Sequence, residues 1–284
     1  MGKYKNYDHI IKFKVITELT SPMHIGASFS EKNEVLVHPI DGTPFVQASS
    51  IAGVLRGYYE KNHSDQVATL FGDNSDEGDS RMIVSDGVFP EGVRYEIRPR
   101  VQIDPVSGTT GKSKVEGTGA LSGHKFDMEC IGKGAKLSFD IYVKGSDFND
   151  EELLMEAFSA VNSGEITIGG QKSNGFGNVK IVSLLEKRFV LSNENDRKEW
   201  INEADIPERD YTQKKDSLVN SVKSSYRIKL NGMTESGILV KGYKKEGFGK
   251  DGADAVNIQD ANGNYIIPGS SIKGSIRSQI ERIV

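Results

Sequence analysis

Paired serines precede a glycine and an arginine at two places in this sequence. Residues 49–56 read SSIAGVLR, and residues 270–277 read SSIKGSIR. At the start of a helix, serine hydroxyls and unpaired backbone N–H groups attract a phosphate through hydrogen bonds and the helix dipole. Arg56 and Arg277 follow about two turns later, where a guanidinium holds a second phosphate or a carboxylate. The alternative is an ordinary capped helix with a surface arginine, but capping alone does not require the repeated glycine and arginine.

A second candidate for anion binding is the glycine-rich segment 169–177, GGQKSNGFG. We expect it between two strands, where its amides, its lysine and its aromatic ring would cradle an RNA backbone and stack a base. It is not a Walker loop, because its lysine is not followed by a helix start in that pattern. A plain glycine-rich hairpin turn is the alternative.

The segment 104–125 is rich in Gly, Ser, Thr and Lys and has little apolar content. We expect a long excursion with a hairpin. Lys112, Lys114 and Lys125 would let this excursion reach over a nucleic-acid strand. An unstructured surface loop is the alternative reading.

Four further cationic or titratable side chains are weaker candidates. Arg94, Arg98 and Arg100 alternate along an expected strand and therefore share one face, which suits a polyanion. The alternative is a solvated face with acidic partners across the strands. His24 lies in the loop after the first strand, where it would contact RNA or act as an acid or base, although a lone loop histidine is more often structural.

Composition limits the function classes. The 284 residues include 36 Lys and Arg against 40 Asp and Glu, so a globally basic nucleic-acid coat is excluded but a local basic groove is not. Cys130 is the only cysteine, and the scattered histidines have no zinc-site spacing. Because no signal peptide or long apolar run is present, a cytoplasmic location is expected.

The elements that must position these residues follow from hydrophobic periodicity. The expected strands are 10–19, 82–88, 93–103, 126–131, 136–143, 166–168 and 177–185, and the expected helices are 50–62 and 150–161. Ser50 is the expected N-cap of the first helix. Strands 126–131 and 136–143 are expected to pair around a glycine turn. The order strand, helix, strands, helix, strand predicts an α+β fold of the ferredoxin-like (βαββαβ) type with an inserted loop.

The two serine motifs belong to a longer internal repeat. At the same constant offset, the turn Asp41-Gly42 aligns with Asn262-Gly263, which implies a duplicated domain. We expect an RNA-binding domain at 1–190, a charged helical linker at 191–223 and an incomplete second domain at 224–284 that begins with a strand at 226–230. A domain cut after its first helix cannot close its sheet, so we expect a truncated product or completion by another chain. A small C-terminal appendage on the first domain is the alternative.

Together these features resemble the repeat-associated mysterious protein (RAMP) superfamily, specifically the backbone subunits of type III CRISPR effector complexes. The resemblance covers residues 10–185 and, as a fragment, residues 226–284. The stretches that carry it are 23–26, 45–56, 70–72 with 80–86, 169–177 and 266–277. It implies a modified RNA-recognition-motif (ferredoxin-like) domain with long loop insertions, followed by the start of a second similar domain.

The resemblance also implies a role. Backbone subunits of this family stack along a CRISPR RNA, and a thumb-like hairpin, here within 104–125, separates guide–target pairs. The implied partners are CRISPR RNA, complementary target RNA and other effector-complex subunits, with no membrane. The residues implied to bind RNA are His24, Ser49, Ser50, Arg56, Lys112, Lys114, Gly169, Gly170, Lys172, Ser173, Asn174, Gly175, Ser270, Ser271, Lys273 and Arg277.

Active backbone subunits of the family cut target RNA with an aspartate in the loop before the paired serines. The corresponding position is Asp254 in the second copy, with Asp251 as its competitor, and Asn33 in the first copy. Asn33 cannot act as a base, so the first copy is expected to bind without cutting, unless a one-residue shift brings in Glu34. No tightly bound cofactor is expected. Cleavage would use the ribose 2′-OH as nucleophile, helped by a divalent metal with a carboxylate or by backbone distortion.

Two other functions fit parts of the sequence. A stand-alone endoribonuclease that processes CRISPR repeat RNA would need a histidine or tyrosine as general acid or base, with His24, Tyr58 and Tyr59 as candidates. A β-rich module that binds protein or carbohydrate without nucleic acid is the third reading, although a single tryptophan argues against a sugar platform. Binding of repeat RNA without cuts would favour the scaffold over the nuclease.

Overall fold

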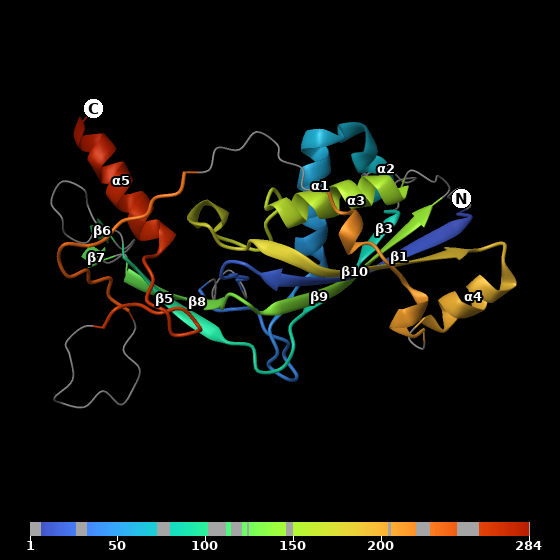
Figure 1. The fold of residues 1–284 in the computed structure, drawn as a ribbon, viewed down its shortest axis with the longest axis horizontal. Coiled ribbons are helices and arrows are strands. Elements are labelled where there is room, and N and C mark those ends of the chain that lie inside the picture. Colours follow the sequence, from blue (N-terminus) through green and yellow to red (C-terminus); the bar gives the residue numbers. More distant parts are fainter. Residues whose placement is uncertain are drawn as a thin grey trace.

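The computed structural model describes residues 7–26, 33–72, 80–101, 112–114, 121–123, 125–145, 150–203, 206–219, 228–242 and 256–283. Its main sheet carries the helices α1 and α3 on one face (Figure 1). Strands β5 and β8 extend from the sheet as a two-stranded arm, and the C-terminal helix α5 lies beside this arm (Figure 1). The chain is therefore divided between a layered α+β body and an arm that meets the second sequence copy.

The elements follow each other in the order that sequence periodicity predicts, with additional short strands and turns. They are β1 (His9–Leu19), β2 (Phe45–Val46), α1 (Ala48–Asn62), η1 (Ser64–Gln66), α2 (Val67–Phe71), β3 (Met82–Val84), β4 (Gly87–Val88), β5 (Tyr95–Val101), β6 (Lys112–Lys114), β7 (Leu121–Gly123), β8 (Lys125–Ile131), β9 (Lys136–Gly145), α3 (Asp150–Ser163), η2 (Lys172–Asn174), β10 (Val179–Val190), α4 (Glu194–Ile201), η4 (Glu208–Asp210), β11 (Thr212–Gln213), η5 (Lys215–Ser217) and α5 (Gly269–Ile283).

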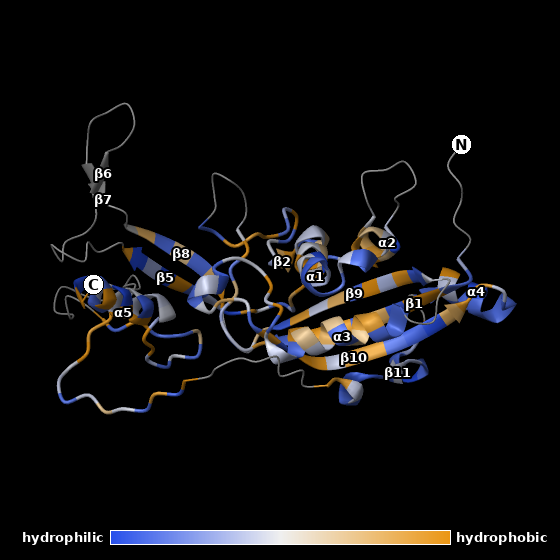
Figure 2. Cartoon of the chain, turned by 90° about the horizontal axis from the view of Figure 1, so that it is seen from above, coloured by the Kyte–Doolittle hydropathy of each residue, from blue (hydrophilic) through white to orange (hydrophobic). Residues whose placement is uncertain are grey.

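The main sheet is antiparallel and has the strand order β11-β10-β1-β9-β4-β2, with β3 also paired to β9. Its central strand β1 alternates: Ile11, Phe13 and Val15 are buried in the hydrophobic core. Because side chains of a strand point alternately to opposite faces, Lys12 and Lys14 lie on the other face. The predicted α+β class is confirmed, with helices on the apolar face of the sheet (Figure 2).

Both long helices bury one stripe of side chains against that face. In α1, Ile51, Leu55 and Tyr59 are buried, and in α3 the stripe includes Leu154 and Phe158. The Phe158 ring meets Phe13 edge to face at 5.2 Å between centroids. One stripe of each helix is therefore buried, whereas Val54 of α1 and Leu153 of α3 are only partly buried.

The predicted pairing of strands 126–131 and 136–143 is wrong. Strand β8 pairs with β5, and β9 pairs with β1 in the main sheet. The glycines between them connect two sheets, because the Gly132 N–H donates to the Arg94 carbonyl and the Gly134 N–H donates to the Leu19 carbonyl, both at 2.8 Å. The apolar side chains of β9 pack in the main core, and β8 pairs with β5 to form the arm.

Two other local expectations are corrected and one is confirmed. Ile166 and Ile168 are buried, but residues 166–168 form no strand, so the glycine-rich segment lies between α3 and β10. In the range 226–230, only 228–230 are described, and they are not in a strand. Within the excursion 104–125, β6 and β7 form an antiparallel pair, as the predicted hairpin requires.

The charged segment after β10 returns to the polar face of the main sheet. Only Glu194–Ile201 is α-helical, and β11 adds an edge strand to β10. Trp200 packs 5.5 Å from the Tyr142 ring and 5.4 Å from the Phe189 ring. The described part of the predicted helical linker is therefore mostly irregular. Packing of Trp200 and pairing of β11 with β10 hold this segment in place instead of a continuous helix. Its boundaries at 191 and 223 stay a prediction.

A buried ion pair joins the start of α3 to β3. Arg81 contacts Asp150, and both side chains are less than a tenth exposed. We expect Asp150→Ala to lower the free energy of unfolding by about 3–5 kcal/mol, because it leaves a buried guanidinium without its counter-charge. Urea denaturation measures the effect. The exposed pair Lys198–Glu194 is the control, and Glu194→Ala is expected to cost less than about 1 kcal/mol. Equal losses in the two variants would contradict this account.

Candidate nucleic-acid interface

The glycine-rich loop 169–177 has a backbone that few other residues could adopt. Gly169, Gly175 and Gly177 have φ between 77° and 88°, and Gln171, at φ 60°, is the one non-glycine with positive φ in the described part of the chain. Positive φ favours glycine because a Cβ atom clashes there with the backbone. Two anchors fix the loop: Gly170 N–H donates to His24 O and Gly177 N–H to Pro22 O, both at 2.8 Å.

The exposed side of this loop presents the groups that suit a phosphate. Gly170, Lys172, Ser173 and Gly175 are exposed, and Asn174 is half-buried. Lys172 begins the short turn η2. An exposed ammonium beside a serine hydroxyl suits an anion, whereas the Gly170 and Gly175 N–H groups donate to the His24 and Lys172 carbonyls. The loop residues predicted to bind RNA are therefore together on one surface.

The inner side of the loop is held by the arm. The Gln171 side-chain oxygen accepts hydrogen bonds from Arg100 at 2.8 Å and from Asn174 at 2.9 Å. Arg100 stacks over Phe176, which packs on Met128 and Cys130. The predicted use of this aromatic ring for stacking a base is therefore wrong, because the ring is only 9% exposed. Phe176 instead fastens the loop to the arm.

Burial also removes the one cysteine from nucleophilic chemistry. Desolvation raises the pKa of the Cys130 thiol to about 12, so the thiol is neutral near pH 7. For Arg100, burial holds the pKa of the guanidinium below its usual range. Both shifts reflect how tightly the arm and the loop enclose this region.

Arg98 and Arg100 lie in β5 and Arg94 directly precedes it, and each of the three contacts other groups of the protein. Arg98 is buried and forms an ion pair with Glu96. Arg94 donates to the Ala261 carbonyl at 3.3 Å and to the Asn262 side chain at 3.2 Å. A polyanion-binding role for this row therefore finds no support, because these charges are used inside the molecule.

His24 is buried rather than presented at the surface. Its side chain is in contact with the Glu129 carbonyl through Nδ1 at 2.7 Å, while its own carbonyl accepts the Gly170 N–H. A side chain at Gly169 would overlap the same carbonyl. The geometry therefore indicates that His24 positions the glycine-rich loop 169–177.

At α1 the paired serines are displaced from the expected cap. The helix begins at Ala48 with Gln47 as N-cap, so the prediction of Ser50 as N-cap is wrong. Ser49 is exposed and Ser50 is half-buried in the first turn. The Asp86 carboxylate accepts the Ala48 N–H at 2.6 Å. A phosphate at this helix end would therefore lie close to a carboxylate, a feature that the serine motif alone did not reveal.

Asp86 is expected to stabilise α1 and to oppose anions at its start. We expect Asp86→Ala to lower the free energy of unfolding by about 1 kcal/mol, since it removes a cap and a charge that complements the helix dipole. The same change is expected to raise the affinity for RNA. Urea denaturation and an RNA titration check the two effects. Asp65→Ala, at an exposed acidic side chain in η1, is the control, and an RNA affinity unchanged by Asp86→Ala would contradict the expectation.

The arginines of the two motifs form the same contact within their own helices. Arg56 pairs with Glu60 at 3.0 Å, and Arg277 pairs with Glu281 at 2.7 Å. The repeat thus extends one turn beyond the predicted motif. Both guanidiniums are at the surface, and each is shared with a glutamate four residues later.

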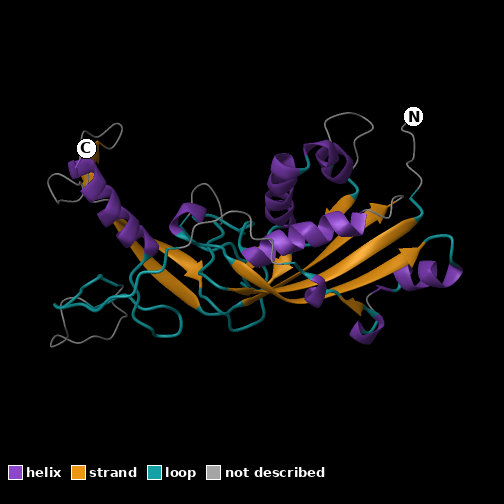
Figure 3. Cartoon of the chain, turned by 45° about the horizontal axis from the view of Figure 1, so that its top comes forward, coloured by secondary structure: helices purple, strands orange, loops and turns teal. Residues whose placement is uncertain are grey.

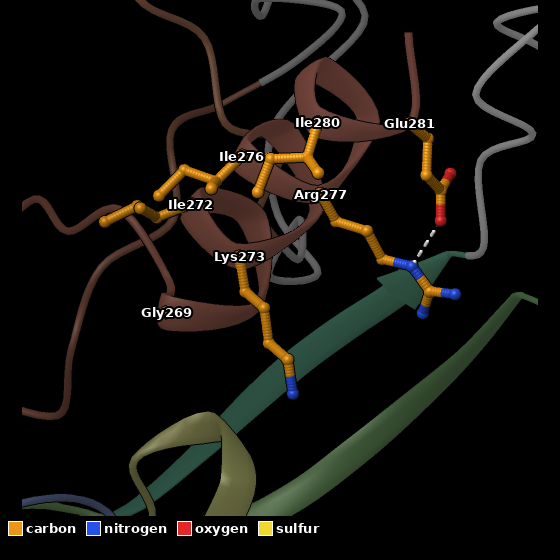
Figure 4. Close-up of a pocket in the computed structure, with 7 residues that line it drawn as sticks. All are labelled: Gly269, Ile272, Lys273, Ile276, Arg277, Ile280 and Glu281. Atoms are coloured by element: carbon orange, nitrogen blue, oxygen red, sulfur yellow. Dashed lines mark hydrogen bonds and ion pairs between the residues drawn. The ribbon is translucent and has the colours of Figure 1, made fainter. Parts of the chain in front are cut away.

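The second serine motif lies directly beside the glycine-rich loop of the first copy. Lys273 donates to the Ser173 carbonyl at 3.4 Å, and a Cβ atom at Gly269 would be 3.2 Å from the Asn174 carbonyl. Ser270 and Ser271 are exposed, and the first turn of α5 contains no acidic residue. Figure 4 shows Lys273 extending to one side of α5, while Ile272, Ile276 and Ile280 point elsewhere.

We call this arrangement the junction grip: the α5 start (Gly269–Lys273) together with the loop residues 170–175. It combines two serine hydroxyls at the start of a helix with the ammonium groups of Lys172 and Lys273, whereas the Gly170 and Gly175 N–H groups donate within the protein, to the His24 and Lys172 carbonyls. The sequence predicted both halves but not that they come together from different copies. In the structure, the first copy supplies the loop and the second copy supplies the helix.

Several predicted site residues are not tested by this geometry. Lys112 and Lys114 lie in β6, and their side chains are not among those described. Asp254 and Asp251 lie outside the described residues. Asn33 accepts the Glu129 N–H through its carbonyl at 2.8 Å, and Glu34 is exposed. Cleavage at Asp254 therefore stays a prediction.

Acid–base and metal chemistry have few candidates in the described part of the chain. Tyr58 donates to Glu156 and Tyr59 to the Leu153 carbonyl, both at 2.8 Å, whereas His24 contacts a different element, β8. Burial raises the pKa of both phenols above their usual range. The described residues contain no cluster of three or more His, Cys, Asp or Glu side chains that could hold a metal ion.

Comparison with known proteins gives three findings. The family model of the RAMP superfamily matches residues 17–180 and 234–284. No curated protein matches this chain in sequence. Among solved structures, one similar chain is in the cryo-EM structure of the type III-B Cmr-beta bound to cognate target RNA, with 17% identity and a TM-score of 0.47. That match covers 62% of this chain and 60% of the other chain.

Proposed function

Because this chain belongs to the RAMP superfamily, we propose that it is a CRISPR RNA-binding backbone subunit of a type III-like effector complex. The observation that carries the proposal is the junction grip, in which exposed serines at the start of α5 lie beside two exposed lysines and the glycine-rich loop. The guide RNA backbone is the ligand that these groups fit, and other effector subunits and complementary target RNA are the partners.

Local charge supports RNA binding despite a net charge of −4. From Ser224 onward, nine Lys and Arg residues stand against six Asp and Glu residues, so the second copy is basic. Phosphate contacts need only a local cluster of cations and amides. The acidic segment around α4 is at the opposite end of the molecule from α5 (Figure 3). A track for RNA along the junction is therefore compatible with the acidic total.

A salt titration with CRISPR repeat RNA tests the proposal. Binding is expected to weaken as salt rises, with a logarithmic slope of about −0.7 for each phosphate neutralised, and the RNA is expected to stay uncut. A slope near zero would overturn the proposal in favour of a module that does not bind nucleic acid. Cut repeat RNA would overturn it in favour of a stand-alone nuclease.

Target cleavage belongs to this proposal as a role of the second copy. Asp254 is the residue that the family pattern assigns to it, and Asn33 at the matching position keeps the first copy inactive. Substituting Asp254 by Ala in the assembled complex, with Asp251→Ala as the matched control, decides the assignment. Unchanged target cleavage by the Asp254 variant would discard it.

The apolar stripe of α5 supports the predicted second RAMP domain at 224–284. At the repeat offset, Ile272, Ile276 and Ile280 match Ile51, Leu55 and Tyr59. The first three are 49–56% exposed, whereas the matching residues of α1 are at most 3% exposed. In the first copy, strands β1 and β9 cover this stripe. We therefore infer that the apolar face of a second antiparallel sheet covers the isoleucine stripe of α5.

Matched charge substitutions test this cover. Leu55→Asp is expected to lower the free energy of unfolding by at least about 3 kcal/mol, because it buries a carboxylate in the core. Ile276→Asp is expected to change it by less than about 0.5 kcal/mol, since the described structure leaves this side chain exposed. Ile276→Asp should instead reduce recovery of the chain in the effector complex. Normal recovery would contradict a covering sheet.

The described residues include no helix long and apolar enough to cross a membrane.

A further inference from the structure

The two copies meet through a turn that occurs in both. The second copy's turn, residues 259–264, rests on the arm of the first copy: Ala261 N–H donates to Glu96 Oε1 at 2.8 Å. The Arg94 guanidinium binds the Ala261 carbonyl at 3.3 Å. The Ala261 methyl group lies where a side chain at Gly132 would be, so only glycine fits there. The contact is built from one carboxylate, one guanidinium and one glycine on a two-stranded arm.

The first copy has the same turn, but its matching residue is exposed among the residues that the structure describes. At the repeat offset, Ile40 matches Ala261 in the segment 38–43. Aspartates organise both turns: Asp41 accepts the Thr43 N–H at 2.9 Å, and Asp260 accepts the Asn264 N–H at 2.8 Å. Both turns also carry a glycine with positive φ, Gly42 at 70° and Gly263 at 84°.

Ile40 is the feature that distinguishes the first turn. It is 89% exposed at the tip of an ordered turn, and Val37 beside it is 40% exposed. The Ile40 N–H has only a long contact of 3.4 Å to the His38 ring, where the matching Ala261 N–H has a carboxylate. What points to a partner is that this exposed isoleucine stands at the position that docks in the second copy, and covering it would remove apolar area from water.

We propose that the turn 38–43 is a docking surface for the two-stranded arm of a separate RAMP subunit, in the way that 259–264 docks on β5 and β8 of this chain. The inference rests on the proposed function. The partner arm would present a carboxylate to the Ile40 N–H and a glycine-lined recess wide enough for the isoleucine side chain. A second copy of this chain does not fit, because its own Ala261 already occupies its Glu96.

Docking through this surface would give the assembly of subunits a polarity. The arm of the first copy is occupied by the second copy of the same chain, and the turn 38–43 is a different surface, so docking at this turn joins unlike surfaces and is of the head-to-tail kind. The intramolecular junction also places the helix of one copy beside the loop of the other. Docking at 38–43 would likewise bring the α1 start, with Ser49, next to the partner's glycine-rich loop.

Photo-crosslinking in the complete effector complex tests the proposal. A benzophenone amino acid replaces Ile40, and a matched variant carries it at Glu91, which lies next to Gly92 (φ 74°) in another exposed turn. We expect Ile40 to cross-link to a different RAMP subunit, within the antiparallel arm that corresponds to β5 and β8, and Glu91 not to do so. Cross-links only to RNA, to a second copy of this chain or to no chain would overturn the proposal.

Substitution separates this contact from RNA binding. Ile40→Asp is expected to reduce recovery of the neighbouring subunit at least about tenfold, and Ile40→Ala to reduce it less, because alanine is the residue that docks in the second copy. RNA affinity of the isolated chain should be unchanged in both variants, since the junction grip is intact. If the unmodified chain does not bind RNA, the proposed function fails. If Ile40→Asp leaves the recovery of the neighbouring subunit unchanged, this inference fails.

Discussion

We expect the double substitution Lys172→Ala and Lys273→Ala to weaken the binding of CRISPR repeat RNA by about thirtyfold at low salt. The two ammonium groups come from different copies and meet at the junction grip. Each lost phosphate contact should also lower the steepness of the salt dependence by about 0.7. A titration at several salt concentrations measures affinity and slope together.

The control for this prediction is a lysine of equal exposure at the other end of the molecule. Lys198 on α4 pairs with Glu194 at 2.8 Å, and Lys198→Ala removes the same charge. Its affinity for RNA should stay within about twofold of the unmodified chain, because it lies beyond the reach of screened charges. If Lys198→Ala and the double variant weaken binding equally, the junction grip is not the RNA site.

Each single variant shows whether the grip acts as one unit. If both lysines contact a continuous RNA backbone, Lys172→Ala and Lys273→Ala should each reduce the salt slope by about half of the combined change. A loss confined to Lys172→Ala would mean that the first copy binds RNA without α5. That outcome would contradict a site composed from both copies.

The second large effect is expected from Gly177→Ala, which should lower the free energy of unfolding by at least about 3 kcal/mol. Gly177 has φ 77°, and a Cβ atom there would overlap the carbonyl oxygen of Ile168. That oxygen cannot withdraw easily, because the Ile168 N–H donates to the Gly177 carbonyl at 2.9 Å. Thermal and urea denaturation measure the loss.

Gly175→Ala separates the overlap from the cost of positive φ. Gly175 is in the same loop at φ 81°, and no atom lies within 4 Å of a Cβ built there. This variant should cost only about 1 kcal/mol. Equal destabilisation in the two variants would contradict a specific clash at Gly177. Because Gly177 holds the end of the loop near Pro22, RNA affinity should fall further in Gly177→Ala than in Gly175→Ala.

Much of the first domain is predictable from local pattern. Alternation along 10–19 predicted β1, and the helical stripes in 50–62 and 150–161 predicted α1 and α3 within two residues at their ends. These features depend on side-chain periodicity, which every residue carries in its own neighbourhood. The matching motifs at 49–56 and 270–277 likewise revealed the second copy.

Partners of strands and charges were not predictable in the same way. Strand β8 reads as the neighbour of β9, yet it pairs with β5, because alternation defines the face of a strand and not its partner. The Arg94 and Arg98 side chains share a face as expected, but only the folded chain brings Glu96 and Ala261 to them. Their availability to RNA was therefore decided by distant residues.

The site shows the same division. By itself the sequence predicted which residue types would bind phosphate: the serines, the glycines, Lys172 and Lys273. Tertiary structure alone decided that Asp86 sits at the start of α1, that Phe176 is buried, and that α5 meets the loop of the other copy. The physical reason is that backbone conformation and periodicity are local properties, whereas burial and electrostatic surroundings are set by segments far away in the chain.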